Sequence, residues 1–94
     1  HPELAFARLA GAPVAASKRT PGGLAIRRAL LEAAGVPVAG LLAGIDRRAA
    51  AVDDLLDAAV LALTAGRIAD GTAIRLPAGA PPRDARGLRM EIWY

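Results

Sequence analysis

The sequence contains no cysteine and a single histidine, His1, and both facts narrow the possible chemistry. Without cysteine, a disulfide scaffold and a thiolate metal site are excluded. One histidine excludes every zinc site built from two or more histidines. A metal site would therefore use oxygen ligands, which in this chain means carboxylates.

Aromatic residues are also scarce, with one Phe, one Trp and one Tyr, too few for a platform on which bases stack. The chain has no Gly-rich phosphate loop and no nucleophile elbow. No run approaches the roughly 18 apolar residues of a membrane-spanning helix, and no targeting segment is visible. We therefore expect a cytoplasmic protein without a membrane partner.

Alanine and arginine are abundant instead, with 24 alanines and 11 arginines against one lysine. A chain of 94 residues is one small domain at most, and it would bury only about 63% of its unfolded surface. The net charge of +3 is compatible with a nucleic-acid partner. A coding bias toward GC-rich codons is the simpler explanation of the arginine excess.

Three helices are predicted, over residues 2–10, 20–34 and 50–69. The first two have a proline in the first turn, and Thr20 supplies a hydroxyl cap to the second. The third has the strongest i, i+3, i+4, i+7 apolar pattern. A glycine that favours the helix C-terminus follows each of them: Gly11, Gly35 and Gly71.

The predicted helix 50–69 is apolar on most of its circumference, because Leu61 and Ile68 lie opposite its main apolar stripe. We therefore expect it to be covered on more than one side. Residues 73–77 and 88–94 are strand candidates, and two strands alone bury too little to be stable. Together these features predict the C-terminal part of a larger α/β domain whose upstream half carries the main sheet.

Asp53, Asp54 and Asp57 form the one group that could carry chemistry. On a helix, Asp57 is the i+3 neighbour of Asp54 and the i+4 neighbour of Asp53, with Cβ atoms about 5–6 Å apart. Asp57 also borders apolar side chains, so burial and repulsion would raise its pKa unless a cation such as Mg²⁺ or Mn²⁺ neutralises the group. The structural alternative is that Asp53 and Asp54 only complement the helix dipole, which explains Asp57 least well.

Four ordered segments together resemble the C-terminal half of a bacterial family, domain of unknown function 429. They are His1–Phe6 with Leu9-Ala10-Gly11, Ser17–Gly23, Asp53–Ala58 and Gly87–Tyr94. Members of this family are predicted nucleases of the ribonuclease-H-like fold. The resemblance implies that residues 1–94 are a single partial domain, completed by an upstream half with a metal-binding Asp.

The resemblance also assigns roles to particular residues. Asp54 and Asp57, with Ala58, are similar to the Asp-x-x-Asp-Ala helix of the Holliday-junction resolvases, which implies that Asp57 is a catalytic metal ligand and Asp54 its helper. Glu3, in the His-Pro-Glu motif, is implied to be a third acid near the site. Lys18 and Arg19 match a basic segment of the family and would meet a phosphate of nucleic acid.

The implied activity is hydrolysis of nucleic-acid phosphodiester bonds by bound Mg²⁺ or Mn²⁺, and we expect residues 1–94 alone to be inactive. One alternative is a non-catalytic nucleic-acid-binding or structural module of the same fold. Another is a free-standing helical interaction domain. The pairs Arg27-Arg28 and Arg47-Arg48 could also contact phosphates, although such pairs are usually solvated surface.

Overall fold

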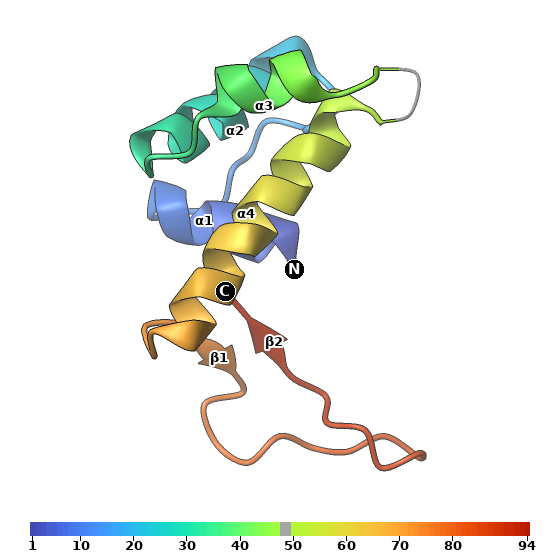
Figure 1. The fold of residues 1–94 in the computed structure, drawn as a ribbon. Helices are drawn as coiled ribbons and strands as arrows, with labels where there is room; N and C mark the ends of the chain where they lie inside the picture. Colours follow the sequence, from blue (N-terminus) through green and yellow to red (C-terminus); the bar gives the residue numbers. More distant parts are fainter. Residues whose placement is uncertain (48–49) are drawn as a thin grey trace.

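The computed structural model describes residues 1–47 and 50–94, and this part combines helices with one small hairpin (Figure 1). In chain order the elements are α1 (Pro2–Ala10), α2 (Pro21–Ala33), α3 (Val38–Gly44), α4 (Val52–Ala69), β1 (Arg75–Leu76) and β2 (Ile92–Trp93). The mixture of helix and strand agrees with the α/β class expected from the sequence. The only sheet within the described residues is this two-stranded one.

The signals that predicted the ends of the first two helices are present in the structure. Thr20 caps α2, where its hydroxyl oxygen accepts a hydrogen bond from the backbone N–H of Gly23 at 3.1 Å. Gly11 and Gly35, just beyond α1 and α2, have φ angles of 74° and 87°. These left-handed conformations strain any residue with a Cβ, so the glycines end the helices at these points.

Two helical details differ from the sequence-based prediction. α4 begins at Val52, two residues later than expected, and Gly71 follows it with a φ of 77°. α3 was not predicted, because it has seven residues, no side-chain cap and two glycines of low helix propensity. Burial of Val38 in the core stabilises α3 instead. This stabilisation comes from packing against other helices, so the local sequence gives no signal for it.

The core lies where α4 crosses the other three helices (Figure 1). Its buried apolar side chains come from all four helices and are Ala5, Phe6, Leu31, Val38, Leu56 and Val60. Six residues form a small core, so each large side chain carries a sizeable share of the stability. Two polar residues, Arg27 and Thr64, are buried among them. Thr64 satisfies its hydroxyl by donating to the carbonyl of Val60 at 3.1 Å.

The C-terminal residues form an antiparallel hairpin that extends away from the helices (Figure 1). The segments 73–77 and 88–94 do contain the strands, but each strand has only two residues. Arg75 lies opposite Trp93, and Leu76 lies opposite Ile92. Arg8 of α1 holds the hairpin to the helices, because its guanidinium donates to the carbonyls of Tyr94 and Thr72 at 2.6 and 2.8 Å.

Large apolar side chains stay exposed along this hairpin and on α4. In the hairpin region five of them are 38–61% exposed: Ile74, Leu76, Leu88, Met90 and Ile92. On α4, Leu61 and Ile68 are 39% and 45% exposed. The described residues therefore do not supply the second cover that the apolar circumference of α4 predicts. The accessible surface of 5945 Å² also exceeds the roughly 5,100 Å² expected for a compact chain of this mass. None of the described helices is long and apolar enough to cross a membrane.

Candidate functional site

A tight turn in front of α2 presents Lys18. The backbone N–H and the hydroxyl of Thr20 both donate to the carbonyl of Ser17, at 3.0 and 2.8 Å. Gly23, in the first turn of α2, lies directly against this carbonyl, and a Cβ on Gly23 would overlap it. The Thr20 cap and the close approach of Gly23 therefore set the position of the turn relative to α2.

Lys18 reaches from this turn to α4 and binds Asp57. Its ammonium donates to Oδ2 of Asp57 at 2.5 Å, and the two side chains are 35% and 17% exposed. The other oxygen of Asp57, Oδ1, is buried and has no hydrogen-bond partner among the described residues. Buried carboxylate oxygens normally have partners, and Oδ1 departs from this rule within the described residues.

Two more carboxylates act on the same ammonium. The pKa of Lys18 is raised above its ordinary value of 10.5, chiefly by its hydrogen bond with Asp57. Burial of the ammonium acts in the opposite direction, and the negative charges of Asp57, Asp53 and Glu3 add to the increase. Asp53 lies one helical turn before Asp57 on α4, whereas Glu3 comes from α1. The charges of three acids from two helices thus act on the one lysine of the chain.

Glu3 is itself bound to a second cation, Arg27. Oε1 and Oε2 of Glu3 accept hydrogen bonds from Nε and Nη2 of Arg27 at 3.2 and 2.7 Å. The guanidinium also donates to the carbonyls of Ala16 and Gly23 at 2.8 and 3.0 Å, and it lies 5.6 Å from the ring centroid of Phe6. Arg27 is only 2% exposed. With these four hydrogen bonds, Arg27 joins α1, the loop before α2 and α2 itself, and it holds Glu3 in place.

The residues proposed from the sequence are therefore only partly brought together. Lys18 and Asp57 form an ion pair, and the charges of Glu3 and Asp53 also act on Lys18. Asp54 and Arg19 are exposed at the surface. Of the weaker basic candidates, Arg28 is exposed and pairs with Glu32 at 2.8 Å, Arg47 is exposed, and Arg48 lies outside the described residues.

Arg27 was not recognised from the sequence as part of this site, although a signal for it exists. Gly23, Arg27 and Leu31 are spaced by four residues along α2, and all three are buried. Residues spaced by four share one face of a helix. The spacing from Gly23 and Leu31 therefore indicates that Arg27 lies on the buried face of α2. A buried arginine needs a carboxylate partner, and Glu3 is the partner that the fold supplies.

The fit of a divalent cation to this site is partial. Asp57 offers an unpartnered buried oxygen, which is the kind of donor that Mg²⁺ and Mn²⁺ prefer. Its second oxygen is taken by Lys18, and both oxygens of Glu3 are taken by Arg27. No group of three or more acids or histidines within the described part could hold a metal ion. The described residues by themselves therefore do not form a metal site.

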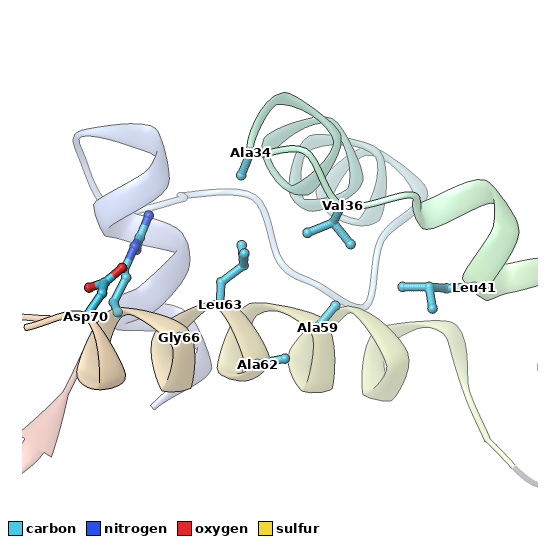
Figure 2. A pocket seen from close by; sticks show the side chains of 9 residues that line it. Ala34, Val36, Leu41, Ala59, Ala62, Leu63, Gly66 and Asp70 are labelled. Atoms are coloured by element: carbon cyan, nitrogen blue, oxygen red, sulfur yellow. The ribbon is translucent and has the colours of Figure 1, made fainter. Parts of the chain in front are cut away.

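A groove of the described surface lies apart from these carboxylates. It has a volume of about 530 Å³ and runs between α4 and the segment that leads into α3. Figure 2 shows Val36, Leu41 and Leu63 along it, with Asp70 at one end. Asp57, Glu3 and Lys18 do not line this groove. Its walls are mainly aliphatic, and Arg67 and Asp70 are the charged residues that line it.

The comparisons with known proteins agree with the resemblance at the level of the family. The profile of the family described as "Protein of unknown function (DUF429)" matches residues 1–81, so the chain belongs to this family. The matched range contains three of the four segments that carried the resemblance, and it ends before the fourth, Gly87–Tyr94. No curated protein and no solved structure matches the chain.

Proposed function

We propose that this chain forms part of a nuclease that uses Mg²⁺ or Mn²⁺ to hydrolyse phosphodiester bonds of nucleic acid, within a ribonuclease-H-like domain. The observation that carries the proposal is the carboxylate of Asp57, which is mostly buried, with one oxygen bound to Lys18 and the other unpartnered. The chain belongs to the family of unknown function, and the resemblance described from the sequence implies that members of this family are predicted nucleases.

In the proposed site, Asp57 would be one ligand of the metal, and residues upstream of His1 would supply the remaining protein ligands. The bound ion would lower the pKa of a water molecule and stabilise the leaving oxygen. Asp53 increases the negative potential around Asp57, since it lies on the same face of α4. Arg27 keeps the carboxylate of Glu3 at the edge of the site, and Lys18 supplies a positive charge that attracts a phosphate.

The uncovered apolar surface supports the proposed upstream half. Leu61 and Ile68 on α4 and the five exposed apolar side chains of the hairpin region are unusually exposed for their size. A further sheet packed on them would remove this surface from water. The same sheet would bring further acids toward α4, where the described residues form no group of three or more possible metal ligands.

The experiment that tests the proposal measures Mn²⁺ binding and nucleic-acid cleavage by the full-length protein. We expect Asp57→Asn to lose Mn²⁺ binding by calorimetry and cleavage of labelled DNA and RNA, with an unchanged circular dichroism spectrum. Glu32→Gln, a control that neutralises an exposed carboxylate on α2, should retain both. Asp53→Asn should weaken binding more than Asp54→Asn, because Asp53 is half-buried on the helix face of Asp57, whereas Asp54 is exposed. Wild-type cleavage by the Asp57→Asn protein would contradict the proposal.

A second candidate function is a non-catalytic module of the same fold that binds nucleic acid or serves a structural role. The ion pair between Lys18 and Asp57 favours it, because this pair neutralises the candidate metal ligand without any metal. This function predicts that wild-type protein binds nucleic acid equally well with Mn²⁺ or with a chelator, and cleaves none.

A further inference from the structure

The C-terminal hairpin concentrates the positive charge of the chain. Residues 75–91 contain four arginines and two acids, so they contribute +2 of the net charge of +3. Every residue from 82 to 90, a segment that we call the hairpin tip, is exposed. The tip extends away from the helices (Figure 1), so the helices leave it open to a partner. The four arginines are Arg75, Arg83, Arg86 and Arg89.

Two of these arginines face each other across the hairpin. Arg83 and Arg89 form an isolated antiparallel bridge, and like charges directly opposite each other in such a pair are destabilising. The guanidinium of Arg83 donates to the carbonyl of Gly87, whereas Arg89 pairs with Glu91 at 3.1 Å. Glu91 also pairs with Arg75 at 3.5 Å. Within the described residues, one carboxylate thus serves three arginines.

The turn of the hairpin tip presents a fourth arginine, Arg86. Oδ1 of Asp84 accepts hydrogen bonds from the backbone N–H groups of Arg86 and Leu88, both at 2.9 Å. This acid therefore shapes the turn, and it forms an ion pair with none of the arginines. The guanidinium of Arg86 has no hydrogen-bond or ion-pair partner in the described part of the chain.

The charged and apolar side chains of the second half of the hairpin lie on opposite faces. Leu88, Met90 and Ile92 alternate with Arg89 and Glu91, and successive side chains of an extended segment point to opposite faces. The ion pair between Arg89 and Glu91, two residues apart, agrees with this alternation. A sheet packed on the apolar face would therefore leave the arginine face open.

We infer that the arginine face of the hairpin tip binds the phosphate backbone of nucleic acid. This inference rests on the proposed function, from which it takes nucleic acid as the partner. A polyanion neutralises the like charges of Arg83 and Arg89, and its regularly spaced phosphates engage several arginines at once. A guanidinium binds a phosphate through two parallel hydrogen bonds. Contacts with phosphates carry no sequence information, so the tip binds without sequence preference.

The competing partner for a basic segment is an anionic membrane. Stable attachment to a membrane surface needs apolar side chains inserted beside the basic ones. In the proposed domain, the upstream sheet covers Leu88 and Met90, so these side chains are not free to insert. The arginine face by itself favours nucleic acid.

The test measures binding of labelled DNA and RNA to the full-length protein by fluorescence anisotropy, with a chelator present to prevent cleavage. Arg86→Gln removes one charge and breaks no side-chain contact. We expect it to weaken binding about threefold and to reduce the slope of log affinity against log salt concentration by about one. Replacing Arg83, Arg86 and Arg89 together should reduce the slope by about three. Arg28→Gln removes the same charge from an exposed pair on α2, and it should leave the slope unchanged.

A variant of opposite sign covers the case in which the arginine variants fail to fold. Asp84→Asn keeps the Oδ1 acceptor that shapes the turn and removes a negative charge from the tip. It should therefore bind nucleic acid about twofold more tightly. Glu32→Gln, which removes an exposed carboxylate from α2, is the matched control. Equal affinities of these two variants would overturn the inference.

The outcomes separate failure of this inference from failure of the proposed function. If Arg86→Gln and Arg28→Gln have the same affinity and slope, the inference is wrong, even if the protein cleaves nucleic acid with Mn²⁺. If the arginine variants bind more weakly but the wild type cleaves nothing with Mn²⁺, the nuclease is wrong and the binding face remains. If Arg86→Gln loses binding to phosphatidylserine vesicles while its affinity for nucleic acid is unchanged, the tip binds membranes and the inference is wrong.

Discussion

The ion pair between Glu3 and the buried Arg27 allows a quantitative prediction about stability. In Glu3→Gln, the guanidinium keeps its bonds to the carbonyls of Ala16 and Gly23 but loses its counterion. Hydrogen bonds to charged groups contribute about 1.5–3 kcal/mol, and breaking a fully buried pair costs about 3–5 kcal/mol. Because the Glu3 side chain is 41% exposed, we expect a loss near the lower range, about 2 kcal/mol.

This loss should lower the midpoint of thermal unfolding by roughly 8–16 °C in a domain of this size. The assay is urea and thermal unfolding followed by far-UV circular dichroism. The matched control is Glu32→Gln, whose ion pair with Arg28 is exposed on both sides and should contribute about 0.5 kcal/mol or less. Equal losses in the two variants would refute the view that Arg27 depends on Glu3.

A double-variant cycle sharpens this prediction. Arg27→Met removes the buried charge, so adding Glu3→Gln to it leaves no cation unpaired. The double variant should therefore be less destabilised than the sum of the two single variants. Additive losses would mean that the two side chains contribute independently of one another.

Three further predictions concern the turn before α2 and two exposed ionisable groups. Gly23→Ala should be destabilising, because its Cβ would overlap the carbonyl of Ser17. Gly22 has open space around it, so Gly22→Ala should stabilise the helix by up to about 1 kcal/mol. Urea unfolding measures both changes, and equal effects of the two variants would contradict the close approach of Gly23 to Ser17. The pKa of Lys18 is raised, so the stability that its ion pair contributes is complete below pH 10.5 and decreases as the pH rises through the folded pKa. In urea unfolding at alkaline pH, Lys18→Met should lack this decrease. Hydrogen bonds from Thr72 lower the pKa of Asp70 below its ordinary value of 3.8. The stability that these bonds contribute is therefore present above pH 3.8 and is lost as the pH falls through the folded pKa. In acid unfolding, the stability of Asp70→Asn should depend less on pH over this range than that of the wild type.

The signals that predicted the structure correctly are local ones. A proline in the first turn, the Thr20 hydroxyl and the glycines after α1, α2 and α4 act within a few residues of the chain, so they can be read without knowing the fold. α3 has no such signal and depends on the burial of Val38, which explains why it was missed. The strands were located but predicted too long, because pairing depends on the partner strand rather than on the segment itself.

In the candidate site too, local features could be predicted from the sequence and contacts between distant residues could not. The sequence alone identified Asp57, Glu3 and Lys18 as candidates, but it could not show which charges are neighbours. Lys18 and Asp57 are 39 residues apart, and Glu3 and Arg27 are 24 apart. Spacing on α4 could not decide between Asp53 and Asp54 as the closer partner, since that depends on which face of the helix the turn before α2 approaches.

By itself, the sequence thus determined the helices with local end signals, the absence of thiolate and paired-histidine chemistry, and the acids and cations available for a site. Tertiary structure decided that Lys18 neutralises Asp57, that Arg27 is buried against Glu3, and that one face of α4 remains uncovered. The physical reason is the distance along the chain over which each interaction acts. Capping and helix propensity act over one turn of backbone, whereas ion pairing and burial depend on which distant segments the packed helices bring within a few ångströms of each other.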